Sequence, residues 1–234
     1  MAMVTFRDHV RVELIRHNAG DEHVIQAAQV SAKGENNPDT VPERLINALT
    51  KHRHGSPFEH TSFTFFVEAP LFVFREWQRH RIGSFNEMSG RYSEMEPTFY
   101  IPSQTRPVIN KGTSMVPKFV VDPDDVSPNN LVVNTLMLNA HRSWDFYEGL
   151  LESGVAKEVA RMVLPLNIYS QMYWTVNARS LMNFLSLRVE SEDSKFKSYP
   201  QYEIQMGAEK VEEIFASVMP LTYKAFVENG RVSP

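Results

Sequence analysis

The order in which strand-like and helix-like segments follow one another restricts the fold of this chain more than any other sequence feature. Apolar residues alternate with polar ones over residues 10–14 and 63–68, which is the period of a half-buried β-strand. A third strand is predicted over residues 169–176. Helical segments lie between and after these strands without a regular βαβ repeat. This order favours an α+β fold in which mixed helices surround a mainly antiparallel sheet.

Capping residues and prolines mark the predicted helices. Asp21 is expected to cap the first helix, Thr40 and Glu43 have the spacing of a capping box before the second, and Asn177 is expected to cap another. The helices are predicted over about 21–33, 42–55, 70–77, 127–153, 155–163, 178–188 and 200–218. The predicted loops are 82–95, the proline-rich surface stretch 102–128, and 189–199. No clean linker interrupts the chain, so a single domain over residues 1–234 is expected.

Composition narrows the classes of function. The 24 basic and 28 acidic side chains among 234 residues give a net charge of −4, whereas proteins that coat nucleic acid or anionic membranes are normally basic. A bound anion must therefore be held by a local cluster of positive charge. The chain has no cysteine, which excludes disulfides, thiolate metal sites and a cysteine nucleophile. Because neither a signal-peptide pattern nor an apolar run of membrane-spanning length is present, a soluble cytoplasmic protein is expected.

The densest group of chemically useful side chains lies at residues 75–92. Arg79, His80 and Arg81 follow an apolar helix, and a loop of hydrogen-bonding residues leads from them to Arg91. Cations at a helix C-terminus are favoured by the helix dipole, so capping on a solvated surface is one interpretation. The loop favours another, because hydroxyl, amide and guanidinium groups together bind phosphates and polar heterocycles. This segment therefore predicts a phosphate or nucleotide site without a glycine-rich phosphate loop.

Arg188 is the second unusual residue. On a helix it shares a face with the apolar residues three, four and seven positions before it, and a permanently charged guanidinium on such a face requires a partner. The alternatives are a structural ion pair and an arginine directed into a ligand pocket. The spacing of His52, His54 and His60 fits no common zinc pattern, so no metal site is predicted.

With these residues the sequence resembles the flavin-dependent thymidylate synthases. Seven residues separate Arg79-His80-Arg81 from Ser89, and further positions of the same segment agree with the family signature. Those positions are Ser84, Asn86, Glu87, Arg91 and Tyr92. Four further segments also resemble sequence segments of the family and occur in the expected order: 57–60, 158–161, 163–167 and 175–180. The likeness therefore runs from about residue 10 to residue 220.

The resemblance implies an enzyme that converts dUMP to dTMP as a homotetramer with active sites at subunit interfaces. Methylenetetrahydrofolate would supply the carbon and NADPH the reducing equivalents through FAD, so that cofactor chemistry replaces the cysteine nucleophile of ordinary thymidylate synthases. The residues implied to bind FAD are Ser56, Arg79, His80, Arg81, Glu87, Asn177, Arg179 and Asn183. Those implied to bind dUMP are Glu76, Gln78, Arg79, Ser89, Gly90, Arg91, Arg161 and Arg188.

The chemistry of the residues agrees with these implied roles. Arg91 and Arg161 suit the nucleotide phosphate, because a guanidinium donates two parallel hydrogen bonds to a dianion. Arg188 suits the uracil edge as the catalytic residue, where a fixed positive charge stabilises negative charge on the activated ring. Ser89 is assigned to binding, since nothing in the sequence places a base beside it.

The chain departs from the family text in two places, and two alternatives stay open. Residues 189–199 lack the histidine that usually follows the arginine at position 188, and the stretch 102–128 does not align. One alternative is a relative that binds flavin or nucleotide without turning over. The other is a nucleic-acid-binding module that uses the basic residues of segment 79–91 on phosphates.

Overall fold

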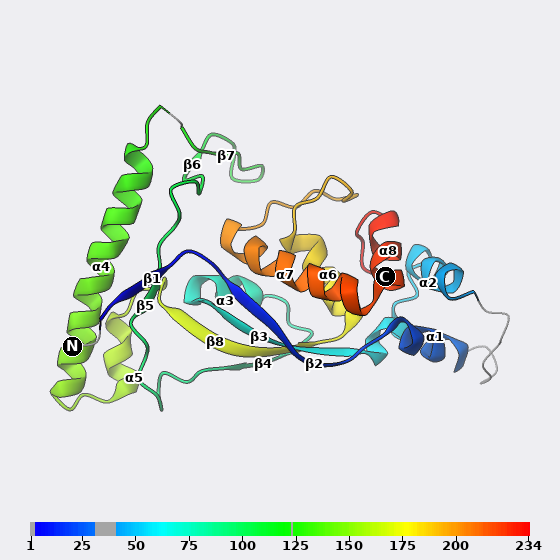
Figure 1. The fold of residues 1–234 in the computed structure, drawn as a ribbon, viewed down its shortest axis with the longest axis horizontal. Coiled ribbons are helices and arrows are strands. Elements are labelled where there is room, and N and C mark those ends of the chain that lie inside the picture. Colours follow the sequence, from blue (N-terminus) through cyan, green and yellow to red (C-terminus); the bar gives the residue numbers. More distant parts are fainter. Residues whose placement is uncertain (1–2, 31–40, 123) are drawn as a thin grey trace. The chain divides into compact units, whose positions relative to one another are not determined.

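The computed structural model describes residues 3–30, 41–122 and 124–234 and has an α+β fold (Figure 1). Its strands are β1 (Thr5–Arg7), β2 (Arg11–Asn18), β3 (Ser62–Pro70), β4 (Ser84–Glu87), β5 (Thr98–Tyr100), β6 (Ile109–Asn110), β7 (Phe119–Val120) and β8 (Tyr169–Val176). Its α-helices are α1 (Asp21–Val30), α2 (Pro42–Lys51), α3 (Leu71–Trp77), α4 (Ser127–Glu152), α5 (Lys157–Ala160), α6 (Ala178–Arg188), α7 (Tyr202–Val218) and α8 (Pro220–Glu228). Short 3₁₀-helices cover Ser56–His60 and Arg161–Val163. The predicted class is confirmed.

The chain divides into two compact units. Unit 1 comprises Met1–Val10, Glu68–Arg75 and Glu87–Gln171, and unit 2 comprises Arg11–Val67, Glu76–Asn86 and Met172–Pro234. The chain therefore passes between them several times, and strands β3 and β8 have residues in both. The expectation of one domain over the whole chain stays a prediction.

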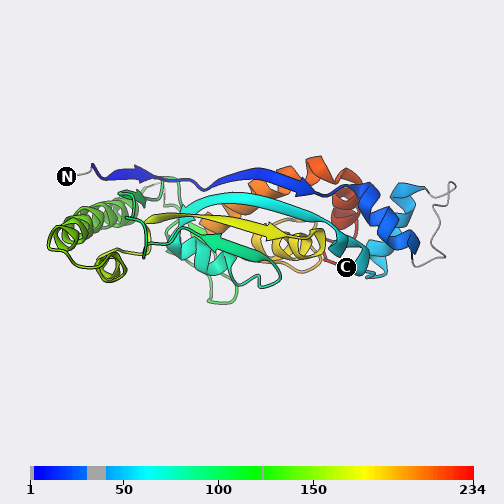
Figure 2. The same ribbon diagram turned by 90° about the horizontal axis from the view of Figure 1, so that it is seen from below.

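Aromatic side chains form the core of unit 2. The apolar alternation in β3 buries Phe63 and Phe65 completely, and Trp174 of β8 stacks on Phe65 with ring centroids 5.6 Å apart. Phe184 of α6 places its ring 4.9 Å from that of Trp174. The largest sheet has the strand order β2-β3-β8-β4, and Figure 2 shows β2, β3 and β8 next to one another. Buried rings at these distances contribute apolar area and directional contacts, so they hold α6 against the sheet.

Two elements differ from the sequence prediction because tertiary contacts decide them. Residues 84–87 form strand β4 instead of a loop, since they pair with β8 at the edge of the sheet, and an edge strand needs no apolar alternation. Asp21 does not cap its own helix. Its carboxylate accepts hydrogen bonds from the backbone N–H groups of Leu221 and Thr222, each at 2.9 Å, and so caps α8, a helix that the sequence patterns did not predict.

Several element boundaries also differ. Helix α2 ends at Lys51, before the predicted end near residue 55, and its N-cap is Val41 without a side-chain hydrogen bond. The predicted capping residue Thr40 and the predicted end of the first helix beyond Val30 lie outside the described residues. Helix α7 begins two residues after Pro200, and the stretch 102–128 contains the short antiparallel pair β6–β7. The other predicted strands and helices are confirmed.

The core of unit 1 packs α4 against the segments around β5. Trp144 and Tyr147 of α4 lie in one buried cluster with Met95 and Phe99. The Tyr147 hydroxyl accepts a hydrogen bond from the backbone N–H of Met95 at 3.0 Å. This contact satisfies a buried polar group and fixes the chain just after Gly90.

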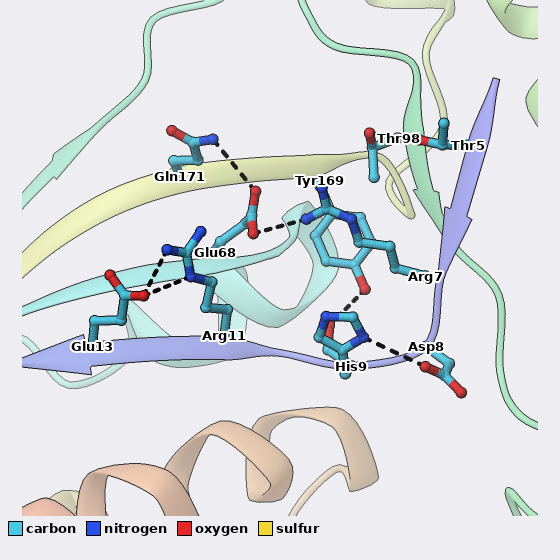
Figure 3. Close-up of polar contacts among 10 residues, drawn as sticks. All are labelled: Thr5, Arg7, Asp8, His9, Arg11, Glu13, Glu68, Thr98, Tyr169 and Gln171. Carbon is cyan, nitrogen blue, oxygen red and sulfur yellow. Dashed lines mark hydrogen bonds and ion pairs between the residues drawn. The ribbon is translucent and has the colours of Figure 1, made fainter. Parts of the chain in front are cut away.

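A buried carboxylate lies at the end of β3 in unit 1. Glu68 is 6% exposed, although the strand alternation placed it with the polar residues, and its carboxylate forms an ion pair with Arg7 at 2.8 Å (Figure 3). The Gln171 amide approaches the other carboxylate oxygen at 3.4 Å. The Tyr169 hydroxyl donates to the His9 carbonyl oxygen at 2.6 Å, and burial raises the pKa of that hydroxyl. The stability of a buried carboxylate such as that of Glu68 depends on a positively charged partner, here Arg7.

Replacing Arg7 with Met is expected to destabilise the protein by about 1–3 kcal/mol, because the buried Glu68 carboxylate would lose its guanidinium partner. Thermal unfolding at pH 7 measures the effect. The matched control is Arg11→Met, whose ion pair with Glu13 has side chains 52% and 46% exposed and should contribute less than about 1 kcal/mol. Equal shifts of the thermal midpoint in the two variants would contradict a larger contribution of the Arg7–Glu68 ion pair.

Candidate active site

Unit 2 contains a cavity of about 640 Å³ in which positive charge is concentrated. The titratable side chains that line it are those of five arginines, His80 and Glu59. The full lining is Arg53, Glu59, Arg79, His80, Arg81, Ile82, Arg179, Ser180, Asn183, Leu187, Arg188, Ser233 and Pro234. A cavity of this volume and charge is suited to an anionic ligand of the size of a nucleotide cofactor.

The basic motif enters this cavity directly after α3. Helix α3 ends at Trp77, and the backbone N–H of His80 donates to the Trp77 carbonyl oxygen at 3.1 Å, which turns the chain. The His80 ring lies edge-on to Phe184, with centroids 4.9 Å apart and an interplanar angle of 73°. Trp77 packs on the same Phe184 at 4.8 Å. The aromatic core therefore holds His80 at the cavity wall, between Arg79 and Arg81.

Arg188, the last residue of α6, has partners in the basic motif and just before it. Its Nε donates to His80 Nε2 at 3.0 Å, and its Nη2 donates to the Glu76 carbonyl oxygen at 3.3 Å. Its Nη1 lies 3.1 Å from the Glu76 carboxylate, and its side chain is 16% exposed. The sequence left two interpretations of Arg188, a structural ion pair and an arginine in a ligand pocket. The structure contains both features, since Arg188 forms an ion pair with Glu76 and also lines the cavity.

The electrostatics of the cavity act on His80. Burial, followed by the charges of Arg188 and Arg79, lowers the pKa of the His80 imidazole from 6.5 to about 4. The ring is therefore neutral at pH 7. A neutral imidazole beside two guanidinium groups leaves the cavity with its full positive charge on the arginines.

Arg179 is positioned by residues that the sequence analysis did not single out. Its Nε donates to the Pro234 carbonyl oxygen at 2.7 Å, and its Nη1 pairs with the Glu59 carboxylate. A Cβ atom at Gly55 would collide with Arg179 Nε and would lie 2.7 Å from the Pro234 carbonyl oxygen, so glycine is required there for the arginine to occupy this place. The segment 57–60 resembles a sequence segment of the family, but only the folded chain brings its Glu59 to Arg179.

Arg53 was also missed, and its backbone explains its position. Arg53 has φ of 63°, in the left-handed region that few residues other than glycine adopt. Its N–H donates to the Thr50 carbonyl oxygen and that of His54 to the Leu49 carbonyl oxygen, which together close α2 in a Schellman motif. The basic run Lys51-His52-Arg53-His54 is the local signal for this ending, and the ending places a further guanidinium on the cavity wall.

Six of the predicted residues meet at the cavity, and others lie beside it or elsewhere. Those that line it are Arg79, His80, Arg81, Arg179, Asn183 and Arg188. Asn177 caps α6 by accepting a hydrogen bond from the Ser180 N–H at 2.9 Å, as predicted, which engages its side-chain oxygen. Ser56 follows Gly55 and is exposed, and Gln78 is exposed on the turn before Arg79.

The remaining predicted residues belong to unit 1. Arg91 donates through Nε to the Glu158 carboxylate at 2.9 Å, and both side chains are about half exposed. A side chain at Gly90 would lie 3.2 Å from Arg161 Cδ, so Arg161 packs directly over the motif backbone. Unit 1 therefore gathers two guanidinium groups around the turn at Ser89. Glu87 accepts a hydrogen bond from the Ser170 hydroxyl at 3.0 Å.

Metal-holding groups and membrane-spanning helices are both absent among the described residues. Within the residues that the structure describes, no group of three or more His, Asp or Glu side chains is arranged to hold a metal ion. Across the same described part of the chain, no helix combines the length and apolar character needed to cross a membrane.

Comparison with known proteins places this chain in a family. The family model described as "Thymidylate synthase complementing protein" matches residues 13–221. A flavin-dependent thymidylate synthase of Streptomyces avermitilis is 48% identical over 98% of this chain and 96% of its own length. The chain belongs to the flavin-dependent thymidylate synthase family. It is an enzyme of that family, and the family resemblance drawn from the sequence is confirmed.

A further member of the flavin-dependent thymidylate synthase family and a solved structure are also similar to the chain. The protein of that name from Tropheryma whipplei is 46% identical over 98% of this chain and 97% of its own length. Among solved structures, the UMP/dUMP methylase PolB from Streptomyces cacaoi, bound with 5-Br UMP, has a TM-score of 0.90. It is 42% identical, and the match covers 99% of each chain. The structural match confirms the α+β fold.

Proposed function

We propose that the chain catalyses the reductive methylation of dUMP to dTMP, with methylenetetrahydrofolate as the carbon donor and NADPH as the reductant through FAD. The observation that carries the proposal is the arginine-lined cavity of unit 2, where six of the residues implied to bind FAD or dUMP meet. The names of the relatives support the reaction. The PolB structures, with 5-Br UMP and 5-Br dUMP, support a uridine nucleotide as substrate.

The cavity residues fit FAD by their chemistry. A diphosphate carries two negative charges, and Arg79, Arg81 and Arg179 line the same cavity, where Glu59 is the acidic side chain among the described lining residues. Asn183 adds an amide, which both donates to and accepts from a polar ring. When bound, FAD supplies hydride-transfer chemistry. The chain has no cysteine to form a thiolate adduct with the uracil, so the proposed reaction proceeds without one.

The chain's own residues bind and orient the nucleotide in this proposal. Arg91 and Arg161 hold the phosphate of dUMP, with Ser89 and Gly90 contributing from the turn between them. Arg188 faces the uracil and stabilises negative charge that develops on the ring. Glu76 contributes to dUMP binding and, through its ion pair, to the orientation of Arg188.

Assembly and location belong to the same proposal. Family membership supports a homotetramer with active sites at subunit interfaces and a cytoplasmic location. The net charge of −4 supports the absence of a nucleic-acid or anionic-membrane partner. Light scattering after size exclusion measures the mass directly. A monomer at micromolar concentration, with full activity, would contradict the shared site.

The visible absorbance spectrum and the product assay together test the function. The purified protein is expected to show flavin absorbance and, with methylenetetrahydrofolate and NADPH, to convert dUMP to dTMP. UMP is assayed in parallel, since the PolB structures contain both nucleotide analogues. Flavin binding without product would support the alternative of an impaired relative. Steeply salt-dependent DNA binding without flavin would instead support the nucleic-acid-binding alternative.

Ser89→Ala is expected to weaken dUMP binding and to retain activity. The Ser89 hydroxyl oxygen accepts from the Arg91 N–H at 3.4 Å, and no base contacts it among the described residues. Loss of one hydrogen bond costs about 0.5–1.5 kcal/mol, or roughly 2–12-fold in KM. Single-turnover flavin oxidation at saturating dUMP measures the chemical step. Complete loss of that oxidation, with nucleotide still bound, would show that Ser89 makes a bond.

A further inference from the structure

The guanidinium of Arg188 is held by contacts in two directions. Its Nε hydrogen points to His80 Nε2, at 3.0 Å, and Nη2 donates to the Glu76 carbonyl oxygen. The guanidinium is planar, so two donors fixed on different nitrogens fix the plane of the whole group. The remaining hydrogens on the terminal nitrogens then have a constant direction. Arg188 lines the cavity with this orientation already set.

This contact determines the state of the histidine. The Nε of arginine always carries a hydrogen, so His80 Nε2 must present a lone pair to accept it. The imidazole is then neutral, and its own hydrogen is on Nδ1. A protonated ring would have no acceptor to offer and would repel the guanidinium. The charged groups that face the ring are Arg188 from α6 and the neighbouring Arg79, and both favour the neutral form.

The histidine is itself held by the core. Its ring lies edge-on to Phe184, and Phe184 contacts both Trp77 and Trp174, at 4.8 and 4.9 Å. The backbone of His80 is tied to Trp77 by a hydrogen bond of 3.1 Å. The aromatic core of unit 2 therefore sets the ring, and the ring sets the guanidinium.

We propose that His80 is a positioning residue for Arg188: its Nε2 accepts the Arg188 Nε hydrogen, fixes the guanidinium plane, and leaves Nδ1–H as the edge that donates to the cavity. The inference rests on the proposed function, in which Arg188 acts on the uracil. The two nitrogens of the His80 ring then have different roles. Nε2 accepts from Arg188, and Nδ1–H is the donor available to FAD. A misplaced catalytic group loses rate steeply with distance, so orientation matters for turnover.

Two variants isolate the acceptor. His80→Phe keeps a ring against Phe184 but has no acceptor, and His80→Gln retains an oxygen that can accept from Arg188. His80→Phe is expected to lower kcat at saturating dUMP about 10–100-fold, whereas His80→Gln should stay within about tenfold of the parent. Thermal midpoints and flavin content, measured for both, identify any loss that comes from folding or cofactor binding.

A double-mutant cycle separates positioning from a direct role. If His80 acts through Arg188, His80→Phe should have little further effect on kcat in the Arg188→Ala background. If it acts only on the cofactor, the loss in that background should equal the loss in the parent, which would overturn the proposal. Equal activity of His80→Phe and the parent would overturn it as well.

Nitrogen-15 NMR of the flavin-free protein provides a test without turnover. The His80 resonances, assigned by their absence from His80→Gln, are expected to show a protonated Nδ1 and an unprotonated Nε2 at pH 7. Arg188→Ala should raise the pKa of His80 from about 4 toward 6.5, since one of the charges that lowers it is removed. A ring protonated on Nε2 would overturn the proposal. Failure of the parent to form dTMP would overturn the proposed function, while this measurement still decides the contact.

Discussion

Arg188→Ala is expected to lower the rate of dTMP formation on the order of 10²–10³-fold at saturating dUMP. The guanidinium is fixed by His80 and Glu76 at the cavity wall, where a preorganised positive charge is most effective on developing negative charge. Flavin content should change much less, because the other arginines of the cavity remain. Steady-state turnover and the ratio of flavin absorbance to protein measure the two effects.

The competing explanation is that Arg188 is only a structural ion pair. Glu76→Gln breaks the same pair but keeps the guanidinium, so it is the matched variant. A purely structural pair predicts similar falls in thermal midpoint for both variants, with turnover surviving in Arg188→Ala. Our assignment predicts the reverse for Arg188→Ala, which should keep most of its thermal stability because Glu76 is 39% exposed and solvent can replace the lost partner.

Arg79→Ala and Arg81→Ala are each expected to weaken FAD binding by about 1.5–3 kcal/mol, which is roughly 10–150-fold in Kd. Both residues line the cavity directly after α3, and a lost charged partner of a diphosphate is not replaced by water at equal strength. Fluorescence titration of the flavin-free protein with FAD measures the affinity. The size of the effect should fall with added salt, since both side chains are exposed.

Arg44→Ala is the control for the effect of net charge. Arg44 is an exposed arginine of α2, in the same unit, and does not line the cavity. It should bind FAD as the parent does. If Arg79→Ala and Arg81→Ala also bind FAD as tightly as the parent, the assignment of the basic motif to the cofactor is wrong.

Local patterns predicted most of the fold. The alternation over 63–68 and the segment 169–176 placed the central strands, and Asn177 marked the start of α6, because strand period and helix capping depend on near neighbours. Strand β4 was not visible locally, since its partner is β8, about ninety residues away in sequence. For the same reason Asp21 was assigned to the wrong helix, as its hydrogen-bond donors are Leu221 and Thr222.

By itself the sequence determined the family, the basic motif at Arg79–Arg81 and the need of Arg188 for a partner, because each depends on residue types at fixed spacing. Only the tertiary structure decided what those residues contact. It joined Arg188 to His80 and Glu76, brought Glu59 and Gly55 to Arg179, and placed Arg53 on the cavity wall. Hydrogen bonds and close ion pairs form over a few ångströms in space, and the distances between residues far apart in sequence are set when the aromatic core packs.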